Sequence, residues 1–417
     1  MNTNKEFDLI VFGATSFVGQ ILCDYLVNEY TEANLTWAMA ARSEPKLTEL
    51  KTKLGEKASL IPSLLADSAD EGSLQMLCSK ASVIISTVGP YALYGELLVK
   101  ACAETGTDYC DLTGEAPWIR LMIERYGETA QRTGARIVNS CGFDSIPSDL
   151  GVMYLQDQAI KQFGAMCPTV KMRVKAMKGG ASGGTIASGI NMYKEAVGNS
   201  ALQAEMRDPY SLCPQNHKFT ENQHQVVFEF DDSFDSWVGP FIMEAINTRI
   251  VFRSNAIRRG GSYSDSFCYD EGTLTGAGKA GEKSAKRISL GTRLAPKLLS
   301  LGLVRNFLVK FILPKPGEGP TKEEQLSGHY DLRFLGLTES SRQIRVKVTG
   351  DKDPGYGSTA KMLAQAAISL HRDVDKGDSP GGFWTPATVF DYKLLDRLRA
   401  HAGMTFELMP DAQEVQN

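Results

Sequence analysis

Three side chains in the N-terminal part of the chain have the chemistry needed to hand a proton to a substrate. Tyr91 and Tyr94 stand in the loop 86–95, and Asp144 stands in the short stretch 141–144. A phenol or a carboxyl group held beside a reacting carbon acts as a general acid, directly or through water. Packing is the alternative role for the two tyrosines, and turn formation is the alternative role for Asp144.

Two further acids, Asp111 and Glu115, stand in the loop Tyr109-Cys-Asp-Leu-Thr-Gly-Glu115 at the end of an apolar run. They are expected either to order a pocket or to take part in proton transfer. Capping of the following helix is the structural reading of each, because a carboxylate in the first turn of a helix accepts from free backbone amides.

A glycine-rich turn near the N-terminus indicates that a bound dinucleotide would lie near these candidate acids. The apolar run 9–12 leads into the turn, and an amphipathic stretch, 20–30, follows it. Strand, tight turn and helix in this order form the phosphate cradle of dinucleotide-binding proteins, in which amides at the helix start face the pyrophosphate. An ordinary glycine-rich turn is the alternative. The residues expected to contact a dinucleotide are Gly13, Thr15, Ser16, Phe17, Val18 and Gly19, with Ser16 in place of the usual middle glycine.

The ends of the next three strands supply the other expected dinucleotide contacts, and the first of them indicates NADP over NAD. Arg42 and Ser43 directly follow the second apolar run, 35–41, where the adenosine ribose of a dinucleotide is expected. An acid at this position would repel a 2′-phosphate on that ribose, whereas a guanidinium would bind it. The expected cofactor is therefore NADP(H). Asp67 ends the third strand and either approaches the adenine or caps the helix that follows. Three residues after the fourth strand are expected beside the nicotinamide ribose, namely Thr87, Gly89 and Pro90.

Alternating strand and helix patterns place these motifs on one sheet. Strands are expected near 59–65, 83–87, 108–111 and 136–139, with helices near 44–54, 70–80, 95–105 and 117–133. This rhythm predicts a Rossmann-type doubly wound parallel sheet. The pattern then changes, with strands expected at 171–177, 225–230, 264–271, 327–336 and 342–349 and helices at 148–162, 185–197, 357–372 and 388–400.

The fold class is thus α/β with a second α+β domain on a mostly antiparallel sheet. The expected divisions are an NADP-binding domain over 1–147, a substrate or interaction domain over 148–350, and a C-terminal segment over 351–417 that packs back on the first domain.

Composition narrows the classes of partner. A net charge of −4 gives no reason to expect nucleic acid. None of the five histidines lies in the first half or pairs at ligand spacing, so no metal is expected. The eight cysteines lack metal-like spacing and mostly lie in apolar runs, which is typical of a reduced, cytoplasmic protein. No signal peptide and no apolar span of membrane length is visible.

One basic, apolar stretch bears on partners. Residues 283–315 carry eight Lys or Arg and no acid among many apolar residues. Such a segment suits peripheral contact with an anionic membrane or lipid surface, or a cover over an acyl-chain pocket. A core helix with a solvated basic face is the alternative, and a homodimer is left open.

Taken with these motifs, the chain resembles the saccharopine dehydrogenase-like family, in particular the branch with trans-acting enoyl reductases and the animal saccharopine dehydrogenase-like oxidoreductase. The resemblance covers nearly the whole chain and implies an NADP-type Rossmann domain, an α+β domain and reductase chemistry. The matching text is the run 13–19, Ala41-Arg42, 87–91, 109–115, 141–149, 180–185, 246–249 with 253–255, 316–320 and Asp353-Pro-Gly-Tyr-Gly357.

Three functions remain open at this point. The first is hydride transfer from NADPH to an activated C=C of a lipid-like or polyketide-like substrate, with a proton from Tyr91, Tyr94 or Asp144. The second is oxidation or reduction of a C–N bond of an amino acid, as in saccharopine enzymes, which needs cationic clamps for carboxylates. The third is a non-catalytic protein that binds NADP and a lipid surface. The candidate clamps are Arg173, Arg249 and Arg253.

Overall fold

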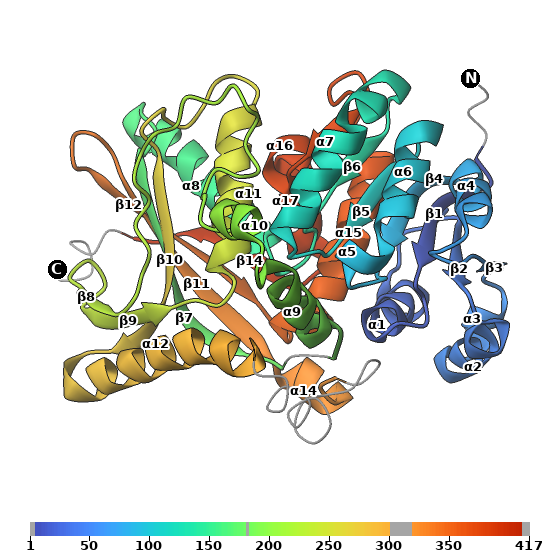
Figure 1. Ribbon diagram of the computed structural model, residues 1–417, viewed down its shortest axis with the longest axis horizontal. Coiled ribbons are helices and arrows are strands. Elements are labelled where there is room, and N and C mark those ends of the chain that lie inside the picture. Colours follow the sequence, from blue (N-terminus) through green and yellow to red (C-terminus); the bar gives the residue numbers. More distant parts are fainter. Residues whose placement is uncertain (1–4, 181–182, 301–318, 411–417) are drawn as a thin grey trace.

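The computed structural model describes residues 5–180, 183–300 and 319–410, and within them the chain builds two seven-stranded sheets side by side (Figure 1). The first sheet is parallel throughout, with the order β13-β6-β5-β4-β1-β2-β3. The expected doubly wound parallel sheet is confirmed. Its strands are β1 (Phe7–Phe12), β2 (Trp37–Ala41), β3 (Ser63–Leu65), β4 (Ala81–Ser86), β5 (Asp108–Asp111), β6 (Arg136–Val138) and β13 (Gly382–Trp384).

Strand β1 illustrates why this sheet is buried on both sides. Successive side chains of a strand point to opposite faces. Leu9 and Val11 enter one hydrophobic cluster, and Ile10 and Phe12 enter another. A strand that is apolar on both faces requires helices on both faces.

Those helices come from distant parts of the chain. One face carries α4 (Glu71–Lys80), α6 (Glu96–Thr105) and α7 (Ala116–Thr133), which pack side by side. The other carries α1 (Phe17–Asp24) and α15 (Thr359–Arg372). The other helical elements of this half are the π-helical turn η1 (Tyr25–Glu29), α2 (Glu44–Leu54), α3 (Glu56–Ser59) and α5 (Tyr91–Tyr94).

A buried arginine fixes α15 on the first sheet. The Arg136 guanidinium on β6 pairs with Asp108 of β5 and also donates to the carbonyls of Leu370 and Val374, each at 2.7 Å. Because buried charges are costly unless paired and hydrogen-bonded, this set of contacts specifies one position for the end of α15.

The second sheet is mixed and mostly antiparallel, as expected; only the β7–β10 pair among its described pairs is parallel. Its order is β14-β12-β11-β7-β10-β9-β8. The strands are β7 (Thr169–Lys178), β8 (Glu229–Asp231), β9 (Ser236–Pro240), β10 (Cys268–Gly276), β11 (His329–Leu337), β12 (Gln343–Gly350) and β14 (Met404–Leu408).

Helices join the two sheets into one body (Figure 1). Helix α8 (Ile146–Phe163) leaves the first sheet and packs on β11, β12 and β14, beside α11 (Glu244–Ile257). The buried apolar residues of α8 belong to the same cluster as Leu9 and Val11, as do Val251 and Phe252 of α11. The remaining elements are α9 (Gly183–Ala196), α10 (Ser200–Glu205), α12 (Gly278–Ser300), α14 (Lys322–Ser327), the π-helical turn η2 (Pro354–Ser358), α16 (Pro386–Phe390) and α17 (Tyr392–His401).

One strand of the expected pattern was wrong. The strand expected at 225–230 is mostly extended loop, and β8 covers only Glu229–Asp231. The segment after residue 351 contributes a strand to each sheet, because β13 pairs with β6 and β14 pairs with β12. No helix within the described ranges is long and apolar enough to cross a membrane.

Candidate active site at the carboxyl edge of the first sheet

The glycine turn is built around two positions where a side chain does not fit. Gly13 has a φ of +87°, and a Cβ added to it would lie 2.7 Å from both the Thr87 Oγ1 and the Val88 Cγ2. A Cβ on Gly19 would lie 2.1 Å from the Gly13 carbonyl oxygen. The turn therefore brings α1 into direct contact with the end of β1, which is the packing that the glycine spacing predicts.

Ser16, at the middle position of the motif, acts as the N-cap of α1. Its Oγ accepts from the Gly19 amide at 2.9 Å and lies 2.9 Å from the Thr87 Oγ1. Thr87 is also 2.9 Å from the Gly13 carbonyl oxygen, which can only accept. Thr87 therefore donates to Gly13 and Ser16 donates to Thr87, so the hydroxyl hydrogen of Ser16 is already used. Ser16 and Thr87 stabilise the turn and leave the phosphate contacts to backbone amides.

Three such amides are free. The N–H groups of Thr15, Phe17 and Val18 have no hydrogen-bond acceptor within the described part of the chain, whereas the neighbouring amides of Ser16 and Gly19 are satisfied. Unpaired amides at a helix start, with the positive end of the helix dipole, form a ready anion site. The cradle thus fits a pyrophosphate, and these three amides are the groups that would hold it.

The tips of the next two strands lie beside the cradle. Arg42 directly follows β2, is exposed, and makes no hydrogen bond or ion pair with any described residue. Ser43 is the N-cap of α2 without a side-chain bond. The Asp67 carboxylate accepts from the Ala69 amide at 3.0 Å, and it is Asp70, not Asp67, that caps α4. A free guanidinium with a hydroxyl next to it suits the 2′-phosphate of NADP.

Replacing Arg42 by alanine is expected to weaken NADPH binding about 10- to 100-fold and to change NADH binding less than about threefold. The reason is that a hydrogen-bonded charge pair contributes roughly 1.5–3 kcal/mol, and NADH has no phosphate at this position. Fluorescence titration of both nucleotides against the wild type and Arg42→Ala measures the difference. Equal losses for the two nucleotides would show that Arg42 does not select the phosphate.

The loop after β4 forms the next part of the site. Gly89 and Pro90 are joined by a cis peptide bond. A Cβ on Gly89 would lie 3.8 Å from the Ser188 Oγ, so α9 of the second half of the molecule stands directly over this loop. The Glu115 carboxylate accepts from the amides of Tyr91 and Ala92, each at 2.9 Å, and thereby ties this loop to the end of β5. Glu115 stands at the N-cap position of α7, but its side chain bonds the first amides of α5 and makes no capping bond to α7.

The geometry argues against Tyr91 as a proton donor. Its ring is buried against Trp118, with 5.4 Å between ring centroids. Its hydroxyl donates to the Ser86 carbonyl oxygen at 2.9 Å, and burial holds the pKa of this phenol well above its usual value. Tyr94 ends α5 with 47% of its surface exposed. Tyr91 therefore packs the loop, while Tyr94 faces outward.

Asp144 has a different environment. It is half-buried in the loop between β6 and α8, and its carboxylate accepts no hydrogen bond from the described residues. Burial and, to a lesser extent, the charge of Asp111 raise the pKa of Asp144 to about 7. A carboxyl group with this pKa is protonated for much of the time near neutral pH, as a general acid requires.

The loop is fixed on both sides of Asp144. The Phe143 amide donates to the Thr359 Oγ1 at 2.9 Å, and the Ser145 hydroxyl donates to the Asn247 Oδ1 at 3.3 Å. Asp111 lies behind it, with hydrogen bonds from the Thr113 amide, the Ser140 amide, the Asn139 side chain and the Tyr109 hydroxyl. Asp111 is saturated and buried, so its role is to order the loops.

A segment without a predicted role, η2, contacts the start of α1 beside the cradle. Asp353 is fully buried, and its carboxylate accepts from Gly180 at 3.1 Å and from Tyr356 at 2.8 Å. Tyr356 in turn packs edge-on against Phe17, with 5.0 Å between ring centroids. The stretch Asp353-Pro-Gly-Tyr-Gly357 was visible as a motif, but its contact with Phe17 joins residues more than three hundred positions apart.

The glycine turn, the loop after β4 and the loop that carries Asp144 thus lie along the carboxyl edge of the first sheet. Helix α9 contacts the loop after β4, and η2 contacts the start of α1. Within the described ranges, no group of three or more His, Cys, Asp or Glu side chains is arranged to hold a metal ion.

Comparison with known proteins places this architecture in one class. Residues 9–138 match the model of the saccharopine dehydrogenase NADP-binding domain. The solved structure of apo saccharopine dehydrogenase (L-Glu forming) from Saccharomyces cerevisiae superposes with a TM-score of 0.52 at 12% identity, covering 97% of this chain and 100% of that one. The protein is an NAD(P)-dependent oxidoreductase with a saccharopine dehydrogenase-like fold.

Sequence relatives narrow the class. A trans-acting enoyl reductase of Mycobacterium bovis is 35% identical over 94% of this chain and 96% of its own length. A protein of the same name from Mycobacterium ulcerans is 34% identical over 95% and 96%. The chain belongs to the saccharopine dehydrogenase-like family, together with these proteins named trans-acting enoyl reductase.

Proposed function

We propose that the protein uses NADPH to reduce an activated C=C bond of a lipid-like or polyketide-like substrate, with Asp144 as the proton donor. The observation that carries the proposal is the protonatable carboxyl of Asp144. It has no hydrogen-bond partner among the described residues, and it stands on a fixed loop at the same carboxyl edge of the first sheet as the dinucleotide cradle. The names of the full-length relatives support the choice of reaction.

The proposed reaction divides the work between cofactor and protein. NADPH, when bound, supplies a hydride from its nicotinamide ring to the β-carbon of an unsaturated thioester or ester. The amides of Thr15, Phe17 and Val18 hold the pyrophosphate, and the loop after β4 positions the nicotinamide end. Asp144 donates its proton to the α-carbon, so that one C=C bond becomes C–C with one added hydride and one added proton.

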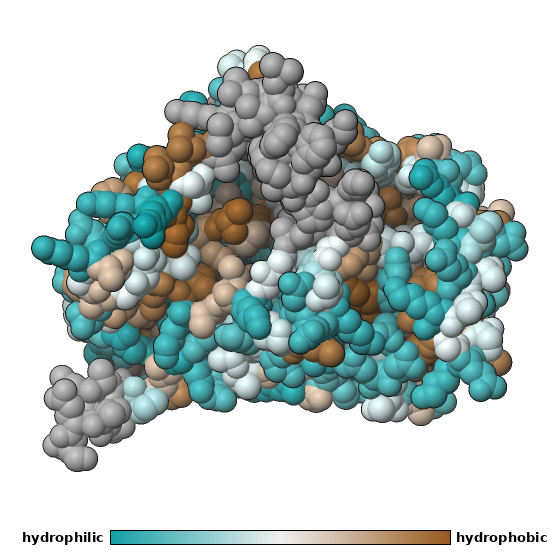
Figure 2. All heavy atoms as spheres, turned by 90° about the horizontal axis from the view of Figure 1, so that it is seen from below, coloured by the Kyte–Doolittle hydropathy of each residue, from teal (hydrophilic) through white to brown (hydrophobic). Residues whose placement is uncertain are grey.

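Apolar side chains at the edge of the site support a lipid-like substrate. Leu93 and Tyr94 on α5, which follows the loop after β4, keep 55% and 47% of their surface exposed. Seen from below, the molecule has a hollow with hydrophobic residues in its wall (Figure 2). An apolar chain would cover such surface favourably.

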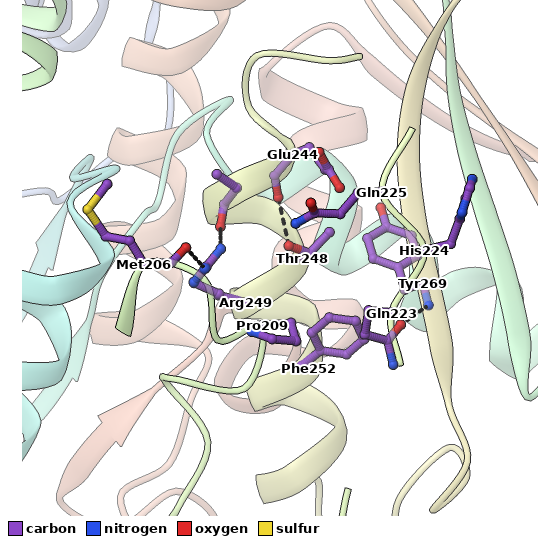
Figure 3. Close-up of a pocket in the computed structure, with 11 residues that line it drawn as sticks. Met206, Pro209, Gln223, His224, Gln225, Glu244, Thr248, Arg249, Phe252 and Tyr269 are labelled. Carbon is purple, nitrogen blue, oxygen red and sulfur yellow. Dashed lines mark hydrogen bonds between the residues drawn. The ribbon is translucent and has the colours of Figure 1, made fainter. Parts of the chain in front are cut away.

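The amino-acid alternative needs free cationic clamps, and the three candidates are already engaged. Arg173 is fully buried between Asp231 and Asp270. Arg249 donates to the carbonyls of Ala245 and Met206 (Figure 3) and lines a cavity of about 70 Å³, which has room for only a few water molecules. Arg253 donates to the carbonyls of Leu212 and Phe383. These contacts favour the C=C reaction.

The test is an assay of NADPH consumption with two substrate classes. We expect oxidation of NADPH with a medium-chain α,β-unsaturated acyl thioester and none with 2-oxo acids plus amino acids. Turnover with the second class alone would assign the amino-acid reaction instead. Tight NADPH binding with no turnover of an acyl-thioester series of increasing chain length would support the non-catalytic alternative.

A further inference from the structure

Helix α12 presents an unusual face to solvent. It runs along the lower outer side of the second half of the molecule, beside β9 and β10 (Figure 1). Its sequence contains a single acid, Glu282, and six Lys or Arg residues. The helix therefore has a formal charge of +5, six cations less one acid, within a chain whose net charge is −4.

Helix α12 faces the second sheet with a row of three small residues. Gly281, Ala285 and Ser289 face inward, and Ala285 is fully buried. A Cβ on Gly239 of β9 would lie 3.3 Å from the Ala285 carbonyl oxygen, so the helix backbone lies close on the strand. Ile288 meets the same strand, because the Cβ built on Gly239 would also lie 3.3 Å from the Ile288 Cβ.

Two large apolar side chains of α12, those of Leu290 and Leu294, point outward instead. Leu290 and Leu294 keep 58% and 43% of their surface exposed. They share the outward face with cations at helical spacing. We call this face the basic-leucine stripe, and it consists of Lys283, Lys286, Arg287, Leu290, Arg293 and Leu294.

An exposed aromatic ring extends the stripe. Phe228, just before β8, is 38% exposed, and the Lys286 Nζ lies 5.4 Å from the centroid of its ring. Lys286 also pairs with Glu282 at 2.5 Å. Lys283, Arg287 and Arg293 have no acidic partner among the described residues and remain available to an external anion.

We propose that the basic-leucine stripe docks the protein on an anionic lipid bilayer, with Leu290, Leu294 and Phe228 in the headgroup region and the cations on lipid phosphates. Cations interleaved with leucine and an aromatic ring on one exposed face are the features of a helix that lies in a membrane interface. A second copy of this chain is a poor occupant, since two such faces repel each other. This proposal is independent of the reaction catalysed.

The experiment is co-sedimentation of the full chain with vesicles of phosphatidylcholine alone or with about one third phosphatidylserine. The wild type is expected to bind the anionic vesicles, to release them as salt is raised, and to leave the neutral vesicles free. Two double variants remove the two parts of the stripe, namely Lys283→Glu with Arg287→Glu, and Leu290→Ser with Leu294→Ser.

Charge reversal is expected to lower the vesicle partition coefficient at least about tenfold, because each cation near an anionic surface contributes about fivefold. The leucine variant is expected to lose about fivefold or more. The matched control, Lys57→Glu with Lys393→Glu, reverses two exposed lysines far from α12 and should bind as the wild type does.

Two outcomes overturn the proposal. One is absence of wild-type binding to the anionic vesicles. The other is equal loss in the control and stripe variants, which would mean that only net charge matters. Within the first outcome, binding of the wild-type protein to polyglutamate would identify an acidic protein as the partner in place of the bilayer. All substituted residues are exposed, so circular dichroism is expected to show unchanged folding in every variant.

Discussion

Replacing Asp144 by asparagine is expected to lower kcat by about 100-fold or more while leaving the affinity for NADPH within about threefold of the wild type. General acids contribute roughly 10²–10⁴-fold to rate, and asparagine keeps the size of the side chain but has no acidic proton. The measurement is steady-state NADPH oxidation with the unsaturated thioester, together with a separate nucleotide titration.

The pH dependence distinguishes a proton donor from a residue that only shapes the loop. Burial raises the pKa of Asp144 to about 7, so the carboxyl is protonated below that pH and loses its proton above it. Wild-type kcat/KM should therefore fall as the pH rises through about 7, and the residual activity of Asp144→Asn should not show this fall. The exposed Asp378 supplies a matched control, since Asp378→Asn should behave as the wild type. If Asp144→Asn kept nearly full activity and the wild-type pH profile, Asp144 would not be the proton donor, and Tyr94 would be the remaining candidate.

Substituting alanine for Gly19 is expected to abolish measurable NADPH binding and to destabilise the protein by about 1–3 kcal/mol. The added Cβ would lie 2.1 Å from the Gly13 carbonyl oxygen and 2.9 Å from the Ser16 Oγ. Neither group can retreat without moving the turn, because Ser16 is bonded to Thr87 and Gly13 accepts from Thr87. The free amides of the cradle would then no longer converge on a pyrophosphate.

Gly127→Ala is the matched control for this substitution. Gly127 lies in α7, and a Cβ there would meet nothing within 4 Å. Alanine in a helix interior is favoured over glycine by about 1 kcal/mol, so this variant should bind NADPH normally and unfold at the same or a slightly higher temperature. Thermal unfolding and nucleotide titration of both variants provide the comparison. Normal NADPH binding by Gly19→Ala would reject the proposed cradle.

The sequence was informative wherever a function depends on residues close together in the chain. The apolar runs before Gly13 and Arg42 predicted β1 and β2, and the glycine spacing predicted the contact between β1 and α1, because all these features are local. The role of Ser16 needed the structure. Its hydroxyl is bonded to Thr87, which follows a different strand, and no local pattern reveals that neighbour.

The parts that could not be predicted depend on long-range pairing. Strand β13 has only three residues and is recognisable as a strand only because β6 lies beside it. Tyr91 directly follows the loop after β4 in the sequence, but Trp118 and the Ser86 carbonyl hold it in the interior. The setting of Asp144 also depends on distant segments, because Thr359 and Asn247 bond the residues on either side of it. Its own carboxyl has no hydrogen-bond partner among the described residues.

The most direct test of the account is a calorimetric titration of the wild-type chain with NADPH and, separately, with NADH. We expect one NADPH bound per chain and at least about tenfold weaker binding of NADH. The proposed pyrophosphate contacts of the Thr15, Phe17 and Val18 amides would be common to both nucleotides, whereas the proposed contact of Arg42 would need the 2′-phosphate, which NADH lacks. Absence of saturable heat with either nucleotide at millimolar concentration would contradict it.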